Sequence, residues 1–360
     1  MNHKTLRPLR TTSAAIFVLF GAISLSVAAS GVPITSGYSD YQPSVIRSRD
    51  GKHRLVFERL DNNLSGDLWI THSGDGGENW STPTPVITSA TNERHPALLE
   101  LSPSNYVLFY LKDTGATSSY RIMRATSSDG LTFTEQQPLD LGWGSGGEIN
   151  PHVIRHNDGS LTMSYQRLGA GSYIARSLDG GASWDTLRTP IATGSQLPRI
   201  AFRERDGLYL ASYQVGNNQL SMHVKTTPNP YDWSAPAQDF AITGNNHDSL
   251  PAVMPDGAFV LFWIVASGNQ FDLRVRRSID GLTWEPTRII TLSANEDDVQ
   301  PHPLIGTSTS TVELYWGRGE APGANNFRIV RDAAVVVSDD VFANGFERSR
   351  QSRDAPAARP

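Results

Sequence analysis

The sequence predicts an all-β protein that forms a six-bladed β-propeller with four-stranded antiparallel blades. Three observations predict this fold. A turn motif of the form Ser-x-Asp-x-Gly-x-x-Trp recurs along the chain, its closing aromatic residues lie 53, 51, 49 and 51 residues apart, and apolar residues alternate with a period near two. A fixed period of about 50 residues with four short strands per unit is typical of propeller blades.

Five copies of the turn motif are present. Two match in full, two are one residue shorter, and the last is degenerate; they are Ser73–Trp80, Ser177–Trp184, Ser127–Phe133, Ser278–Trp284 and Thr226–Trp233. In such a turn the Asp bends back to backbone amides, the Gly adopts a positive φ, and the aromatic ring packs between neighbouring units. We therefore expect these Asp residues to hold turns and to carry no chemistry.

The first half of each unit begins with a proline followed by an apolar segment. Six such prolines occur, namely Pro43, Pro96, Pro151, Pro198, Pro251 and Pro301. A polar turn and an alternating second strand follow, as in Leu161–Tyr165, and a third strand such as Asp67–Thr71 leads into the turn motif. A short fourth strand completes each unit, so six units predict six blades.

The sixth unit lacks the turn motif. Phe327–Arg331 is predicted as its third strand. A closed ring needs a final outer strand to remove open sheet edges. Either Val335–Val337 or the N-terminal Val32–Thr35 can supply that strand, and the sequence leaves both open.

The composition indicates a globular protein without disulfides. The chain has 360 residues, 38% of them hydrophobic, and no Cys, which suffices for one large all-β domain. The net charge is −5 and no basic stripe is visible, so we expect no nucleic-acid partner. No short ligand motif such as His-Glu-x-x-His is present, although His and carboxylate side chains together suit divalent ions. We expect no metal, no cofactor and a monomer.

The N-terminus has the pattern of a secretory signal peptide, predicted to span residues 1–29. Lys4, Arg7 and Arg10 precede an apolar run from Ala14 to Val27, and small residues follow it. The run is short for a membrane span, which favours a signal peptide. A single-helix anchor is the alternative. The mature protein is predicted to be secreted or periplasmic, with no stable membrane span.

The chain changes character after Asp340. Residues 341–360 are rich in Arg, Ala, Pro and Ser and offer little to bury, which predicts a disordered tail after a propeller domain of residues 30–340. Val341–Glu347 resembles a short C-terminal signature of secreted proteins from some Gram-negative bacteria.

With their blade-length spacing, the turn motifs resemble the Asp-box, or BNR, repeats of the sialidase superfamily, and the resemblance covers roughly residues 40–335. It implies a six-bladed propeller whose pocket lies at the mouth opposite the Asp boxes. It also implies carbohydrate substrates. Sialidases use three arginines on the substrate carboxylate, an Asp acid/base and a Tyr nucleophile assisted by Glu, and a neutral nucleophile suits an anionic sugar.

Carried over residue by residue, the resemblance is partial. Tyr41-Gln42-Pro43 stands where the family has Arg-Ile-Pro, and Val299–His302 holds no Tyr where the nucleophile would begin the sixth blade. Asp61 has the offset from Ser73 of the family's acid/base, and Glu148 followed by Arg167 resembles its Glu and Arg pattern. The carry-over thus implies an acid/base and one Arg, but not the full constellation.

The residues around each predicted inner-strand start are expected to face the mouth. They include carboxylates in five of the six units and several His residues, and convergent Asp, Glu and His side chains suit acid/base chemistry on a sugar. The alternative is that these groups cap strand ends and turns. Trp143, Trp263 and Trp316 are candidates for stacking on sugar rings or for the core.

Two functions from different classes follow. The first is a glycoside hydrolase in which Asp61 or Glu148 is the acid/base and Asp248 or Asp298 assists. Its predicted substrate contacts are Arg94, His95, His152, Arg167, Arg199, His247 and His302. The second is a non-catalytic propeller that binds a glycan or a protein.

Overall fold

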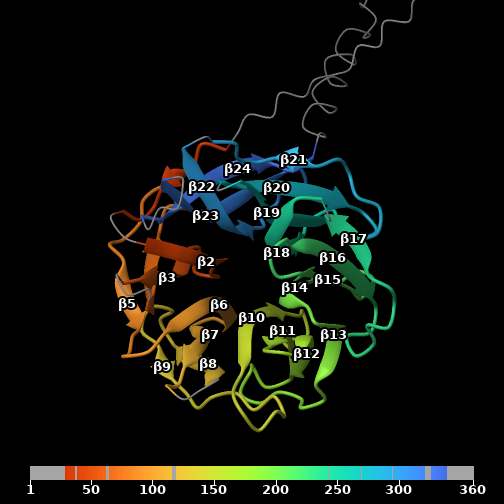
Figure 1. Ribbon diagram of the computed structural model, residues 1–360. Helices are drawn as coiled ribbons and strands as arrows, with labels where there is room; N and C mark the ends of the chain where they lie inside the picture. The colour runs from red at the N-terminus through yellow and green to blue at the C-terminus, as the bar shows by residue number, and fades with distance from the viewer. Residues whose placement is uncertain are drawn as a thin grey trace, which may run out of the picture.

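The computed structural model describes residues 29–338, except 37–38, 62–64, 116–118, 242, 269, 294 and 321–325. Within these residues the protein is a ring of six four-stranded antiparallel sheets, and no helix occurs among them. Figure 1 views the ring along its axis, with the six sheets arranged around the centre. The predicted six-bladed β-propeller is therefore confirmed. The predicted tail and all but the last residue of the predicted signal peptide lie outside the described residues.

Each blade is built from four strands, and in the first five blades these follow sequence order from the axis outward. Blade 1 comprises β2 (Ser39–Arg47), β3 (His53–Leu60), β4 (Gly66–Ser73) and β5 (Thr84–Ile87). Blade 2 comprises β6 (Glu93–Ser102), β7 (Asn105–Asp113), β8 (Tyr120–Ser127) and β9 (Thr134–Glu135). Blade 3 comprises β10 (Glu148–Arg155), β11 (Leu161–Arg167), β12 (Gly171–Ser177) and β13 (Thr189–Thr193).

The remaining three blades repeat this plan. Blade 4 comprises β14 (Gln196–Arg203), β15 (Leu208–Val215), β16 (Ser221–Thr227) and β17 (Gln238–Ala241). Blade 5 comprises β18 (Asn245–Val253), β19 (Phe259–Ser267), β20 (Gln270–Ser278) and β21 (Arg288–Ile289). Blade 6 comprises β22 (Glu296–Leu304), β23 (Thr311–Glu320), β24 (Arg328–Val336) and β1 (Val32–Pro33).

The N-terminal strand closes the ring. Val32 pairs with Arg331 and Pro33 with Val330, so β1 is the outer strand of blade 6. The alternative candidate, Val335–Val337, does not form that strand, because Val335 continues β24 and pairs with Val312. Blade 6 thus takes its strands from both ends of the chain, and this pairing joins the ends of the ring.

The turn motifs form the expected turns. In the copy at Ser177, the Ser hydroxyl donates to Asp179 at 2.8 Å and accepts the Gly181 N–H at 2.8 Å, and Gly181 has φ +84°. The Trp184 ring meets Phe109 of blade 2 edge-on, with ring centroids 5.6 Å apart. The aromatic residue therefore packs between blades, as predicted.

The two faces of the ring follow from the strand directions. Because the strands are antiparallel, the motifs that end the third strands lie at the face where the first strands end. This is called the box face below. The first strands begin at the opposite face, which is called the mouth.

The hydrophobic core lies between adjacent blades. Val260 and Leu273 of blade 5, for example, form one cluster with Leu314 and Trp316 of blade 6. Trp263 and Trp316 are buried core residues, which assigns both to packing. Across the described residues, no helix is long and apolar enough to span a membrane.

Candidate functional site

Each of the six inner strands carries a β-bulge near the mouth. At the bulge, two residues of the inner strand have no partner in the pairing with the second strand. The first of these two unpaired residues has a φ between 47° and 57° in every blade. These residues are Gln42, His95, Asn150, Leu197, Asp248 and Gln300. A left-handed conformation costs a non-glycine residue about 1–2 kcal/mol. Because it occurs at the same place in all six blades, it is a property of the architecture, and the bulge changes the direction of the neighbouring side chains.

The bulges correct the predicted alignment of blade 5. In the other five blades the second skipped residue is the opening proline, but in blade 5 it is Ser249. Pro251 lies two residues further along β18 and pairs with Leu261. In all six blades the inner strand begins two to six residues before the opening proline, so the prediction that the strands start at these prolines is wrong. Blade 5 differs only in that Pro251 lies beyond the bulge, at an ordinary ladder position.

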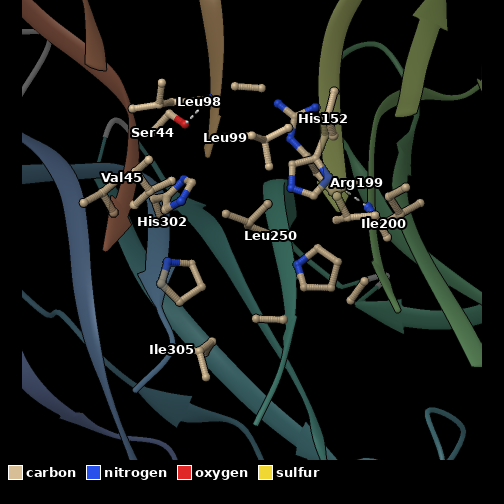
Figure 2. Close-up of a pocket in the computed structure, with 18 of the residues that line it drawn as sticks. Ser44, Val45, Leu98, Leu99, His152, Arg199, Ile200, Leu250, His302 and Ile305 are labelled. Atoms are coloured by element: carbon tan, nitrogen blue, oxygen red, sulfur yellow. Dashed lines mark hydrogen bonds between the residues drawn. The ribbon is translucent and has the colours of Figure 1, made fainter. Parts of the chain in front are cut away.

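A cavity of about 610 Å³ lies at the centre of the ring and is lined by the six inner strands. Its volume falls within the range of about 300–1,000 Å³ typical of small-molecule sites. Near the mouth its polar lining residues come from the bulges or from two residues beyond them; they are Gln42, Ser44, His95, His152, Arg199, Asp248, Ser249, Gln300 and His302. Figure 2 shows part of this lining, with His302 across the cavity from His152 and Arg199.

The residues two places before each bulge are buried in the blades. They are Asp40, Glu93, Glu148, Ser195, Asn246 and Asp298, and none of them is more than 6% exposed. Their positions alternate with those of half-buried neighbours such as Tyr41 and Arg94. The bulge therefore separates a buried ring of polar residues from the ring that lines the cavity.

In four blades the buried residue is an acid that lies directly across from a base on the second strand. The nearest N···O distances are 2.7 Å for Asp40 and Arg59, 3.5 Å for Glu93 and Lys112, 2.9 Å for Glu148 and Arg167, and 2.7 Å for Asp298 and Arg318. In blade 5, Asn246 accepts the Trp263 indole N–H instead, at 3.0 Å. These carboxylates are therefore engaged as structural partners of cations.

Of the four predicted catalytic carboxylates, Asp248 lines the cavity and the other three are not among its lining residues. Glu148 is paired with Arg167, and Asp298 with Arg318. Asp61 follows β3 and accepts the Ser65 N–H at 2.8 Å within its own loop. The structure thus does not bring the four carboxylates together around one point in the cavity.

Four of the seven predicted substrate contacts, His95, His152, Arg199 and His302, line the cavity. The other three contact neighbouring side chains. Arg94 donates to Glu58 at 2.8 Å, Arg167 to Glu148 at 2.9 Å, and His247 lies 3.6 Å from the Asp248 carboxylate.

Arg199 differs from the other arginines near the mouth because none of its described contacts is an ion pair. Its Nη1 donates to the carbonyl oxygens of Asn150 at 3.2 Å and Pro198 at 3.1 Å. Burial lowers the pKa of Arg199 to about 10, and the charge of Asp248 opposes that effect. The guanidinium therefore remains charged at neutral pH and faces the cavity.

The cavity histidines are neutral at pH 7. Burial, followed by the charges of Arg199 and His302, holds the pKa of His152 well below its usual value. Burial also lowers the pKa of His302 to about 4, although hydrogen bonds to the backbone of Val45 and Pro43 raise it. The Nδ1 atom of His152 accepts the Ile200 N–H at 3.3 Å, so the neutral ring carries its proton on Nε2.

Glu58 is a buried acid near the mouth that sequence reasoning missed. It lies on β3 directly across from Tyr41, is fully buried, and binds Arg94 through one carboxylate oxygen. Burial raises the pKa of Glu58, and burial together with the charge of Glu58 raises the pKa of Tyr41 to about 12. Strand β3 also carries His53, Arg54 and Arg59, so one more charged residue on it gave no signal of its own.

Among the described residues, no group of three His, Cys, Asp or Glu side chains is placed to hold a metal ion. Trp143 is half-buried and donates its indole N–H to Tyr165, with the Arg167 guanidinium 4.9 Å from the ring centre. Its ring is therefore held by other side chains of blade 3.

Several solved structures share this architecture. A protein of unknown function from Dyadobacter fermentans superposes with a TM-score of 0.65 at 14% identity, over 85% of this chain and 98% of that chain. The K499G mutant of NanB sialidase from Streptococcus pneumoniae gives a TM-score of 0.66 at 11% identity, over 86% of this chain and 71% of that chain. The protein has the sialidase-like propeller fold.

A third sialidase-like propeller makes the same point. The intramolecular trans-sialidase from Ruminococcus gnavus has a TM-score of 0.59 at 11% identity, over 85% of this chain and 97% of that chain. No family model matches the sequence, and no curated protein matches it. Identities this low show the fold alone, so the function has to be argued from the cavity.

Proposed function

We infer that the protein is a non-catalytic propeller that binds a carbohydrate at the mouth of its central cavity. The observation that carries this proposal is the state of the acids near the mouth. Asp40, Glu93, Glu148 and Asp298 are each matched with a cation across the strand pair. A glycosidase of the common type needs two carboxylates free to act on the same bond.

The remaining polar lining suits recognition of hydroxyl groups. Gln42 and Gln300 carry neutral amides that both donate and accept hydrogen bonds, the neutral imidazole of His95 does the same, and that of His152 offers its Nε2–H as a donor. A pocket with a few convergent polar groups is the usual form of a small-molecule site. The sialidase-like neighbours support a glycan as the ligand class.

A glycan array with the purified mature chain tests this proposal. We expect binding to a limited set of glycans, with a roughly tenfold loss for Asp248→Asn, because a carboxylate hydrogen bond contributes about 1.5–3 kcal/mol. Asp239→Asn is the matched control, since Asp239 lies on the outer strand β17 with 64% side-chain exposure. Binding that is equally weakened in both variants, or absent from the whole array, would contradict a mouth site for carbohydrate.

A glycoside hydrolase is the second candidate, and one observation favours it. Tyr41 lies across from the buried Glu58, and the sialidase resemblance implies a Tyr nucleophile assisted by Glu. A panel of aryl glycosides that includes a sialic acid substrate separates the two functions. Turnover that disappears in Tyr41→Phe and in Asp248→Asn would establish hydrolysis, whereas glycan binding without turnover supports the binding protein.

A further inference from the structure

The central cavity has a second half that the carbohydrate proposal does not use. Beyond the polar residues near the mouth, each blade contributes a large half-buried apolar side chain to the cavity lining, and blade 5 contributes the smaller Ala252 as well. The large side chains are Ile46, Leu99, Ile154, Phe202, Val253 and Ile305, one from each of blades 1 to 6. They lie four or five residues past the bulge on strands that run from the mouth to the box face.

These six side chains are supported from behind by the interblade core. Ile46 and Leu99, for example, pack against separate core clusters while remaining partly accessible from the cavity. Figure 2 shows Ile305 on the side of the cavity away from His152 and Arg199. The cavity therefore has a polar part at the mouth and an apolar part in its middle, while its box-face end carries Arg155, Asn157 and Glu204. Apolar cavities favour apolar ligands over water.

Arg199 lies at the boundary between the two parts. It is two residues beyond its bulge residue and three before Phe202, which belongs to the apolar ring. Its Nη1 is bound to backbone carbonyls, while Nε and Nη2 make no hydrogen bond to a described atom. A half-buried cation without an ion-pair partner is an attractive site for an anionic group, because part of the desolvation cost of the guanidinium is already met in the fold.

His152 supplies a second hydrogen-bond donor at the same position. Its Nδ1 is occupied by the Ile200 N–H, which leaves the Nε2–H as a neutral donor on the residue that shares the cavity wall with Arg199. Asp248, nearer the mouth, is the carboxylate that acts on Arg199, but the two form no ion pair. An anion at this position would thus contact the Arg199 guanidinium and the His152 Nε2–H. Both groups lie between the mouth and the apolar side chains of the lining.

We propose that the cavity binds an amphipathic carboxylate, with its carboxylate on Arg199 and its unbranched apolar chain among the six side chains of the apolar ring. The head group shares His152 with the carbohydrate site, but the apolar chain occupies a part of the cavity that the carbohydrate proposal does not use, and the ligand chemistry differs. The two proposals therefore stand or fall separately.

Isothermal titration of the mature chain with butanoate, hexanoate, octanoate and decanoate tests the proposal. We expect the dissociation constant to fall by about fourfold for each added CH₂ until the apolar part is filled. Octanoate should bind roughly tenfold more tightly than 1-octanol, because the alcohol cannot form a charge-assisted bond with Arg199. Affinity that is independent of chain length would overturn the proposal.

Two pairs of variants localise the head group and the chain. Arg199→Gln should remove the preference for octanoate over 1-octanol and keep the dependence on chain length, whereas Arg155→Gln, at the box-face end of the cavity, should change neither. Val253→Thr should weaken decanoate binding, whereas Val336→Thr, an exposed valine on β24, should not. A preference that survives in Arg199→Gln but is lost in Arg155→Gln would overturn the assigned orientation. Thermal unfolding of each variant confirms that it is folded, and the comparison of octanoate with 1-octanol on the unmodified chain needs no variant.

Discussion

Glu148 and Arg167 face each other across β10 and β11, with Glu148 Oε1 2.9 Å from Arg167 Nη1. The same arrangement joins Asp40 to Arg59 in blade 1 and Asp298 to Arg318 in blade 6. These acids, whose positions in the sequence predicted a place at the mouth, therefore hold the inner two strands of their blades together.

The first prediction concerns Glu148. Glu148→Gln should lower the free energy of unfolding by about 2 kcal/mol, because it leaves the partly buried Arg167 and Arg121 without their shared carboxylate. Urea denaturation measures the loss. Asp248→Asn is the control, and it should cost less than about 1 kcal/mol because Asp248 pairs with no Lys or Arg among the described residues. An unchanged unfolding curve for Glu148→Gln would make Glu148 a candidate catalytic acid again.

The second prediction concerns ring closure. Gly31 precedes the closing strand with φ +61°, and a Cβ at this position would lie 2.8 Å from the buried Trp316 ring. Gly31→Ala should therefore displace β1 and lower the melting temperature by several degrees, which corresponds to a loss of about 2–3 kcal/mol.

Gly51→Ala is the matched control for the closing strand. Gly51 has φ +81°, but a methyl group at this position would have nothing within 4 Å, so the substitution adds backbone strain without a clash. It should cost about 1 kcal/mol. Equal melting temperatures for the two alanine variants would show that the contact with Trp316 does not secure the ring.

The third prediction concerns acid. The pKa of His302 is about 4 in the folded protein, against about 6.5 in an unfolded chain. Between these values the unfolded chain binds the proton and the folded protein does not, so the free energy of unfolding falls as the pH falls. Between pH 7 and pH 4.5 this residue should account for a loss of about 2 kcal/mol.

Comparing the protein with His302→Gln isolates this effect. Burial raises the pKa values of Glu58, Glu93 and Glu148, and these groups change stability in the opposite direction. They are present in both proteins and cancel in the comparison. Chemical denaturation at both pH values should show a shallower loss for His302→Gln, and parallel losses would exclude His302 as the source.

The fold was predictable because its signals are local and repeated. Each turn motif, such as Ser177–Trp184, combines a polar turn with an aromatic residue at a fixed place, and the spacing counts the blades. The closing strand was not predictable. Val32–Thr35 and Val335–Val337 are both short and apolar, and only the pairing of Val32 with Arg331 distinguishes them.

The site was predictable in part, for a reason that lies in the bulges. His95 and Asp248 line the cavity as expected, whereas Glu148 and Asp298, two residues before a bulge, are buried in their blades. Strand alternation alone does not reveal where a bulge shifts the register. The pairing of Glu148 with Arg167 also joins residues that lie 19 positions apart in a hairpin, and the sequence does not state the register of that hairpin.

The last prediction separates the box face from the mouth. Asp179 accepts hydrogen bonds from the Ser183 N–H at 2.9 Å and the Ser177 hydroxyl at 2.8 Å. Asp179→Ala should therefore destabilise the protein by about 1–2 kcal/mol, while Leu178→Ala, which alters an 84% exposed neighbour in the same turn, should have little effect. Because this turn lies at the face opposite the mouth, neither substitution should change the affinity for a glycan or for octanoate in the folded protein. Urea denaturation and calorimetric titration give the two readouts. An affinity that falls in Asp179→Ala at a temperature where the variant is fully folded would show that the turn motifs take part in binding.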